Sequence, residues 1–326
     1  MIGVVGVGVT GTRIVAQLLA LGHFPIGVFD RSPIRARDLA SLYNSGSFLL
    51  EVLEEKQLSK CDVVVLACAK PHIHLAESLI KSGVKVVSLS DDVHDTRAML
   101  GLHQLAGENR TVAIVGTSAS PGLSGLLARS AYRRFDSVDE IHVALHGTGG
   151  PDCARQHHSA LSQRSIGWHD DYWLQRSAGS GRELCWFPEP VGARDCYRAA
   201  IADPLLLKFA MPHLQRVTGR MSATRRDRFT SRLPMMAPPH PEGGMGGVRV
   251  EIRGWRSGSR IVEIFGAAER VAQIAGVVAA STVSELVSGG FREEGVFALG
   301  SPQVPNQRIL RLVESAGIRI HEFVSN

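Results

Sequence analysis

The first eleven residues limit the fold of this chain more than any other segment. They read MIGVVGVGVTG, in which Gly6, Gly8 and Gly11 form a G-x-G-x-x-G pattern between an apolar run and an amphipathic stretch. In this context the first glycine permits a tight turn, the second lets a phosphate approach the backbone, and the third lets the next helix pack closely on the strand. The N-terminus of that helix presents free N–H groups to an anion. We therefore expect a Rossmann domain that holds a dinucleotide.

Short apolar runs alternate with amphipathic stretches through the first third of the chain. Runs that are apolar throughout are typical of parallel strands covered on both faces. Right-handed crossovers then produce a doubly wound parallel sheet over residues 1–120. We expect strands at 2–7, 24–29, 63–68, 84–89 and 112–115, a weaker strand at 47–50, and helices at 10–21, 32–43 and 72–82.

After residue 120 the pattern changes to that of an α+β domain, expected at 121–290. We expect a long strand at 138–146, a hairpin formed by 248–255 and 260–265, and a buried, Ala-rich helix at 269–287. Residues 147–247 show no clear period and are expected to be irregular. The predicted fold class is α/β: a doubly wound Rossmann domain, then a second α+β domain made of a mixed sheet backed by helices. Residues 291–326 are expected to return to the first domain.

The cofactor is predicted to be NAD or NADP. Asp30 ends the second expected strand, near the spacing of about 20 residues at which a carboxylate accepts hydrogen bonds from the cofactor ribose. That carboxylate favours NAD, but Arg31 follows at once and Arg35 lies one turn later. Either guanidinium is able to hold a 2′-phosphate. Further contacts with the cofactor are expected from Thr10, Ala67 and Cys68.

Three candidate catalytic residues lie in the loops that follow two strands of the first domain. Ligands of doubly wound sheets bind beyond the carboxyl ends of the strands, and the loops there contain Lys70, His72 and Asp92. Lys70 and His72 are able to donate a proton, and Asp92 to orient a base or a cationic nitrogen. Each also has a structural interpretation: Lys70 as a solvated lysine, and His72 and Asp92 as helix caps.

Candidate substrate contacts in the second domain are His146, Arg225 and Arg226. His146 ends a strand just before a glycine-rich segment, which is typical of a ligand loop and equally of a tight turn. Arg225 and Arg226 belong to an arginine-rich segment, and guanidinium groups bind carboxylates through two hydrogen bonds. A solvated or interfacial arginine face is the alternative. The neighbouring His157 and His158 match no metal-ligand spacing, so no metal is predicted.

Composition argues against nucleic-acid and membrane partners. The hydrophobic fraction of 44% and the charged fraction of 21% are ordinary for a globular protein. No apolar run approaches the roughly 18 residues needed to span a bilayer. The net charge of +5 comes from arginines, which outnumber lysines 30 to 6 and are spread along the chain without interleaved aromatics. The five cysteines form no CxxC pair, and the chain opens on a strand rather than a leader, so we expect a cytoplasmic protein.

Three segments give a family resemblance: the glycine pattern together with VVVLACAKPHIHLAESLIKSGVKVVSLSDD, then GTSASPGLSGLLAR, then GVFALGSPQVPNQRILRLVESAGIRIHEF. Together they resemble the saccharopine dehydrogenase-like family. The resemblance implies a homodimer and NAD(P)-dependent hydride transfer at the C–N bond of an imine or secondary amine. The substrate is then expected to be a small, amino-acid-like carboxylate. Residues 147–247 carry no resemblance, so the substrate is not identified.

Two other functions remain open at this point. One is a non-catalytic NAD(P) sensor, whose cofactor changes its affinity for a partner. The other is an enzyme that uses bound NAD transiently, as a cyclodeaminase or an epimerase does. Both are compatible with the same dinucleotide-binding pattern.

Overall fold

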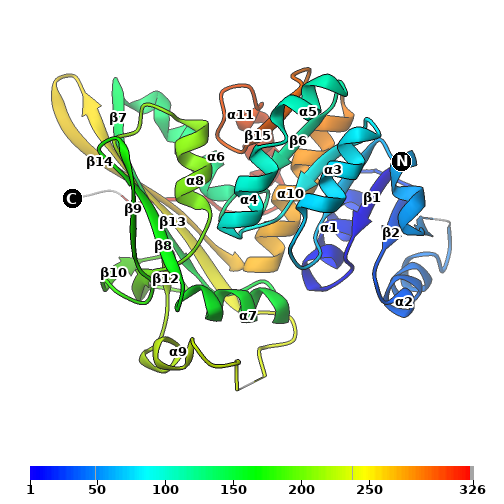
Figure 1. Ribbon diagram of the computed structural model, residues 1–326, viewed down its shortest axis with the longest axis horizontal. Helices are drawn as coiled ribbons and strands as arrows, with labels where there is room; N and C mark the ends of the chain where they lie inside the picture. The colour runs from blue at the N-terminus through cyan, green and yellow to red at the C-terminus, as the bar shows by residue number, and fades with distance from the viewer. Residues whose placement is uncertain (48, 237, 324–326) are drawn as a thin grey trace.

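The computed structural model describes residues 1–47, 49–236 and 238–323. It contains two β-sheets at opposite sides of the molecule, with helices packed between them (Figure 1). The expected α/β class, with a parallel Rossmann sheet and a second mixed sheet, is confirmed. Among the described residues, no helix is both long and apolar enough to cross a bilayer.

The first sheet has seven strands, all parallel, in the order β15-β6-β5-β4-β1-β2-β3. β1 and β4 are neighbours, but the chain continues from β1 toward β3 at one edge of the sheet and from β4 toward β6 on the other side. The crevice for a ligand therefore lies at the carboxyl ends of this pair of strands. The weaker strand expected at 47–50 begins only at Leu50, and Phe48 lies outside the described residues. The strands are β1 Ile2–Val5, β2 Ile26–Phe29, β3 Leu50–Val52, β4 Val63–Leu66, β5 Lys85–Ser88, β6 Val112–Val115 and β15 Gly295–Ala298.

The helices of the first domain connect these strands, and the expected ones are all present. Two short helices, α4 and α5, were not expected, because the segment between β5 and β6 has only a weak apolar period. The helices are α1 Val9–Ala20, α2 Pro33–Tyr43, α3 Ile73–Lys81, α4 Val93–Leu100 and α5 His103–Glu108, with a 3-10 turn at Glu55–Lys60.

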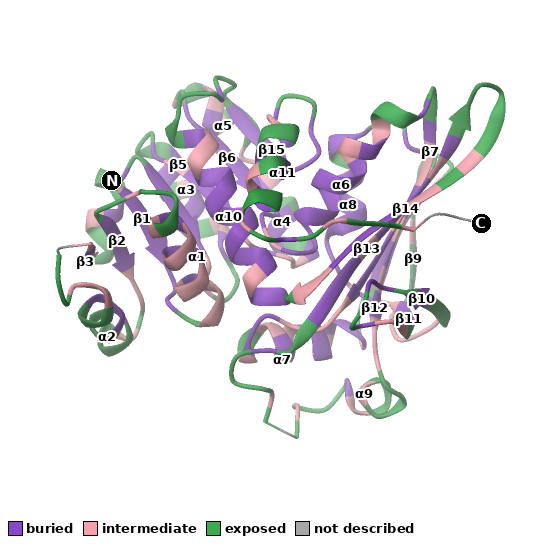
Figure 2. Cartoon of the chain, turned by 180° about the vertical axis from the view of Figure 1, so that it is seen from behind, coloured by how far each residue is buried: buried purple, intermediate pink, exposed green. Residues whose placement is uncertain are grey.

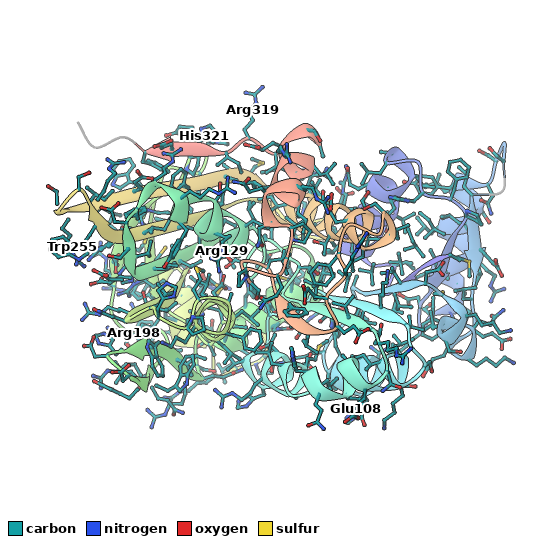
Figure 3. All side chains as sticks on the ribbon, turned by 90° about the horizontal axis from the view of Figure 1, so that it is seen from above. Glu108, Arg129, Arg198, Trp255, Arg319 and His321 are labelled. Carbon is teal, nitrogen blue, oxygen red and sulfur yellow. The ribbon has the colours of Figure 1, made fainter. Side chains whose placement is uncertain are left out.

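The second sheet has nine strands and is mixed. β12 runs parallel to β7, and all other pairs are antiparallel. The expected hairpin is longer than predicted; its two twelve-residue strands end in a turn where Ser257 and Gly258 have φ of 51° and 77°. Trp255, near this turn, lies at the end of the molecule away from the first domain (Figure 3). The strands are β7 Ser137–His146, β8 Arg164–His169, β9 Tyr172–Ser177, β10 Glu183–Trp186, β11 Ala193–Arg198, β12 Arg216–Ser222, β13 Met245–Arg256, β14 Ser259–Arg270 and β16 His321–Phe323.

The prediction that residues 147–247 are irregular is wrong. This segment supplies five strands of the second sheet, β8 to β12, and three helices: α7 Pro151–Ala160, α8 Asp203–Ala210 and α9 Arg225–Thr230. The strands were missed because several of them lie on exposed sheet surface. In β9, five of six residues are exposed, so no alternation between apolar and polar residues appears in the sequence.

The long helix α10, Val271–Val287, packs mainly on the first domain rather than on the second, to which its position in the sequence assigned it. It contacts α1 along its length and covers β4 and β5. Close approach of the two helices depends on Gly276, because a Cβ there would lie 2.8 Å from the Cβ of Arg13. The remaining helices of this central layer are α6 Leu123–Ala131 and α11 Asn306–Ser315.

The C-terminal segment divides between the two sheets. β15 pairs with β6 and completes the first sheet, as expected for a segment that returns to the first domain. β16 differs from the expectation, because it pairs with β14 at the edge of the second sheet. Buried side chains run without interruption from the first sheet through α10 and α6 into β7 and β13 (Figure 2).

Asp203, the first residue of α8, is a fully buried carboxyl group. One oxygen accepts a hydrogen bond from Ser124, and the other has no partner among the described residues. Burial raises the pKa of Asp203 to about 6, against an ordinary 3.8, a difference that corresponds to about 3 kcal/mol. At pH values below the ordinary pKa of 3.8, protonated Asp203 stabilises the folded state relative to the unfolded state. This stabilisation is lost as pH rises through about 6.

Replacing Asp203 with Asn is expected to raise the free energy of unfolding above neutral pH, by up to about 3 kcal/mol. The amide removes the buried charge and its carbonyl still accepts the bond from Ser124. The gain should shrink as pH falls below 6, where the native carboxyl group is already protonated. Urea unfolding at several pH values measures this, and a gain that does not depend on pH would contradict it.

Candidate functional site

The glycine loop between β1 and α1 forms an open cradle. Gly6 has a φ of +89°, and a Cβ there would lie 2.7 Å from the backbone of Cys68. A Cβ on Gly11 would lie 1.8 Å from the carbonyl oxygen of Gly6. Gly8 differs from both, because a Cβ there would meet no atom within 4 Å. The loop is therefore tight on its inner side and open at Gly8, where α1 begins without a side-chain cap, and this shape suits a phosphate.

Asp30 fixes the edge of this cradle. Its carboxylate accepts hydrogen bonds from Val7 N at 2.9 Å and from Ser32 N at 2.8 Å, so it joins the glycine loop to the start of α2. The remaining lone pairs of the carboxylate are available to ribose hydroxyls. Arg31 and Arg35 are exposed beside it and form no ion pair among the described residues. The geometry is therefore compatible with both NAD and NADP, as the sequence is.

The other predicted cofactor contacts surround the same crevice. Ala67 and Cys68 follow β4 and lie against Gly6. Thr10, in the first turn of α1, contacts the second domain: a Cβ on Gly149 would lie 3.3 Å from the Thr10 hydroxyl, and one on Gly150 would lie 3.2 Å from Val9. The glycine-rich loop after β7 therefore reaches over the start of α1.

Lys70 and Asp92, predicted separately as catalytic, form an ion pair with each other. Asp92 is also the N-cap of α4, where its other oxygen accepts from His94 N and Asp95 N, both at 2.9 Å. Burial alone would raise the pKa of Asp92, but Lys70 and these N–H groups lower it below its ordinary value. This geometry supports the interpretation of Asp92 as a helix cap. The Lys70 side chain, at the other end of the ion pair, is partly exposed.

His72 does not reach the crevice, contrary to its predicted role as a proton donor. The side chain is 2% exposed. Its Nδ1 lies 2.9 Å from the Ser88 hydroxyl and its Nε2 lies 2.9 Å from the carbonyl oxygen of Cys68. Burial lowers the pKa of the imidazole. Both ring nitrogens are thus committed to holding the β4 and β5 loops together.

A different titratable group lies at the carboxyl end of β5. Asp91, one residue before the predicted Asp92, accepts hydrogen bonds from His157 Nε2 at 3.0 Å and from the amide of Gln156. The Cys153 sulfur lies 3.7 Å from the same imidazole nitrogen and accepts from Gly149 N at 3.4 Å. We call Asp91, Cys153, Gln156 and His157 the Asp91–His157 network. It joins the first domain to α7 of the second.

Within this network the pKa of His157 is raised. The imidazole is buried, and burial alone would lower its pKa, but the Cys153 sulfur and the Asp91 carboxylate raise the pKa well above its ordinary value. A carboxylate that accepts from a ring N–H stabilises the imidazolium in just this way. The raised pKa of His157 favours its protonated form, and a histidine of this kind is suited to act as a general acid.

The same side chains also have the donor atoms of a metal site. Ligand atoms of Asp91, Cys153 and His157 all lie within 4.8 Å of one another. A metal-bound histidine normally donates its other ring N–H to a partner, whereas the buried Nδ1 of His157 has none among the described residues. The hydrogen bonds to Asp91 and Cys153 account for these side chains without an ion. The absence of a metal remains a prediction.

His157 also lines a cavity of about 720 Å³ between α7 and the end of the second sheet. This volume suits a small-molecule ligand. The predicted His146 lines it, and its Nδ1 lies 2.7 Å from the Ser222 hydroxyl. Other lining residues come from β10, β11 and β12 and from the start of α9: Leu184, Ala193, Arg194, Asp195, Met221, Ala223, Thr224 and Asp227.

Arg225 and Arg226, predicted to bind a substrate carboxylate, do not line this cavity. Both are exposed on α9, and among the described residues they form no ion pair. Their neighbours Arg228 and Arg232 line a separate cavity of about 650 Å³ on the other side of α9. The arginine that does reach the cavity beside His157 is Arg194 on β11.

The sequence contains partial signals for the members of the Asp91–His157 network, which were not predicted. Cys153 and His157 are four residues apart, so they share one face of a helix, and Asp91 follows a recognised strand. Nothing in the sequence links Asp91 to α7, because that contact depends on how the two domains pack. Arg194 was missed because it lies in the segment whose strands were not recognised.

Comparisons with known proteins agree with this architecture. Residues 1–92 match the model of the shikimate / quinate 5-dehydrogenase family. The structure is similar to saccharopine dehydrogenase (L-Glu forming) from Saccharomyces cerevisiae, with a TM-score of 0.73, 15% identity and 99% of each chain covered. It also resembles a mutant meso-DAP dehydrogenase from Clostridium tetani, with a TM-score of 0.52, 14% identity, and 94% of this chain and 95% of that one covered. No curated protein matches the sequence as a relative. The predicted saccharopine dehydrogenase-like resemblance is thus confirmed at the level of the fold.

Proposed function

We propose that this protein is an NAD(P)-dependent oxidoreductase that transfers hydride at the C–N bond of an imine or secondary amine bearing a carboxylate. The observation that carries the proposal is the place of the Asp91–His157 network. It lies between the glycine cradle of the first domain and the cavity of the second, and Asp91 there accepts a hydrogen bond from His157, whose pKa is raised. The similar structures whose names are those of dehydrogenases support the same class of reaction.

The residues of the crevice fit a nicotinamide dinucleotide. Its pyrophosphate would be held at Gly8 and the start of α1, its ribose by Asp30, and a 2′-phosphate, if present, by Arg31 or Arg35. When bound, the cofactor supplies or accepts the hydride. The chain supplies the binding, the exclusion of water and the movement of one proton.

The Asp91–His157 network carries that proton. In the reductive direction, the nitrogen of the substrate gains a proton as the adjacent carbon gains hydride, and His157, which lines the cavity and has a raised pKa, would supply that proton. Asp91 stabilises the charged imidazole before transfer, and Gln156 holds the Asp91 carboxylate in place. In the oxidative direction the same groups take the proton up.

The proposal predicts that the purified protein oxidises NADH or NADPH only when a 2-oxo acid and an amine are supplied together. The reason is that the reducible C=N bond forms from these two reactants. Absorbance of the reduced nicotinamide follows the reaction, and mass spectrometry identifies the secondary amine. Cofactor binding without turnover would instead support the sensor. Turnover without net change in the cofactor would support the cyclodeaminase or epimerase type of reaction.

Two accompanying expectations belong to the same proposal. We infer a homodimer, from the family resemblance, and a cytoplasmic location. Light scattering of the purified protein tests the first, and fractionation of cells that express the chain tests the second.

A further inference from the structure

The cavity beside His157 contains an arginine without a counterion. Arg194 donates to the carbonyl oxygen of Ala193 at 3.0 Å, and it forms no ion pair with any carboxylate among the described residues. The two carboxylates that line the same cavity are committed elsewhere. Asp195 pairs with Arg182 at 2.9 Å, and Asp227 accepts from Thr224 N at 2.9 Å in the cap of α9. The cavity therefore presents a guanidinium fork that is free to take a carboxylate.

No second arginine or lysine lines the described part of the cavity. Its lining also contains His240, whose Nδ1 accepts a hydrogen bond from Glu242 N at 3.2 Å. His146 is the nearest candidate, but burial and the adjacent Arg194 lower the pKa of His146, so its ring is neutral at neutral pH. His157 is already paired with Asp91, and His158 Nε2 donates to the carbonyl oxygen of Thr230 at 3.0 Å. Arg194 is thus the one arginine or lysine that the described part of the cavity offers to an anionic group.

The rest of the lining is largely apolar. It includes the side chains of Leu161 from the end of α7, Leu184 from β10 and Met221 from β12, with Ala154 and Ala223 beside them. Leu184 is 56% exposed although it is a large hydrophobic residue. An exposed apolar surface inside a cavity is typical of a ligand-binding wall.

We propose that the substrate carries a single carboxylate, bound by Arg194, and an apolar body that rests on Leu161, Leu184 and Met221. This inference rests on the proposed function and narrows its substrate class. The carboxylate lies at the β11 end of the cavity and the C–N bond at the His157 end. A substrate with a second carboxylate would place that charge on the apolar wall without a partner, which is unfavourable.

Calorimetry with three related ligands tests this inference without requiring turnover. The probes are N-benzylglycine, its primary amide, and N-(4-carboxybenzyl)glycine, each added to protein already saturated with NADH or NADPH. N-benzylglycine is a secondary amine with one carboxylate and an apolar ring. We expect it to bind a few-fold more tightly than the amide, because the amide loses the charge-assisted pair with the exposed guanidinium of Arg194. We expect a similar preference over the dicarboxylate.

Variants then assign the preference to Arg194. Arg194→Met should abolish the preference for the carboxylate over the amide, and Arg194→Lys should retain only part of it because lysine lacks the two-pronged fork. Arg225→Met is the matched control, since Arg225 is exposed on α9 outside the cavity, and its preference should equal that of the native protein. An unchanged preference in Arg194→Met, tighter binding of the dicarboxylate, or no binding of any probe would overturn the inference.

The same experiment separates this inference from the proposed function. Carboxylate-selective binding that depends on Arg194, without any hydride transfer, would support the inferred ligand class and contradict the proposed reaction. Hydride transfer at the same rate in Arg194→Met would support the proposed reaction and contradict the inferred role of Arg194.

Discussion

Replacing Asp91 with Asn is expected to lower kcat for reduction of the C=N bond by about 10²- to 10⁴-fold, the usual contribution of a positioned general acid. The amide oxygen of the new side chain is still able to accept from Gln156, so the local packing is kept. The amide nitrogen, however, is a donor where His157 needs an acceptor. The imidazole then loses the negative charge that holds its proton, and protonation of the substrate nitrogen becomes the slow step.

Asp92→Asn is the matched control for this experiment. Asn is also a good helix N-cap, so α4 should keep its start, and Asp92 faces Lys70 rather than His157. Its kcat should stay within a few-fold of the native value. A loss in Asp92→Asn as large as that in Asp91→Asn would instead restore Lys70 and Asp92 as the catalytic pair.

The pH dependence of the native protein provides a second measurement of the same group. Because the pKa of His157 is raised, the acid form should persist through neutral pH. The rate of reduction should then decline only as pH rises through that raised value. In Asp91→Asn the decline should move to lower pH, since the neighbouring carboxylate is gone. An identical pH profile in both proteins would show that His157 does not supply the proton.

The second large effect is expected at Gly8. Replacing Gly8 with Asp should weaken the binding of NADH and NADPH by at least about 100-fold, because it places a carboxylate against the pyrophosphate, and such like-charge contacts cost several kcal/mol. The substitution suits the fold: Gly8 has φ of −73° and ψ of −165°, and its Cβ direction is open. The melting temperature without cofactor should therefore be unchanged.

Calorimetric titration measures the affinity, and Gly8→Ala serves as the smaller substitution. It adds bulk but no charge, so its effect should be clearly weaker than that of Gly8→Asp. Gly11→Ala is unsuitable for this purpose, because a Cβ at that position would lie 1.8 Å from Gly6 O and disturb the loop itself. Native-like affinity in Gly8→Asp would show that the cradle does not bind the phosphates.

The sequence was sufficient to predict the features that depend on local spacing. The positions of Gly6, Gly8 and Gly11 relative to a strand and a helix determine the cradle, and Asp30 follows from the βαβ geometry. Apolar runs identified the strands of the first sheet, because parallel strands buried on both faces leave a clear signal.

The features that depend on packing between distant segments were not predictable in this way. Asp91 meets His157 only because α7 packs near the carboxyl end of β5. Lys70 and Asp92 lie in two separate loops, and their sequences do not show that the two side chains pair. Arg194 lies in a strand without a clear apolar period, whereas Arg225 and Arg226 belong to a segment of high charge density, which predicts a site where the structure has an exposed helix. Local patterns indicate which loops border a site, but the tertiary contacts decide which side chains face it.

The contribution of α10 and β15 to the first sheet has a consequence for how this chain folds during synthesis. A ribosome that has released residues 1–120 has produced every element of the glycine cradle, but not the helix that covers β4 and β5 or the edge strand beside β6. That nascent segment exposes apolar surface until almost the whole chain has emerged. Truncation near the C-terminus should therefore damage cofactor binding at the opposite end of the sequence.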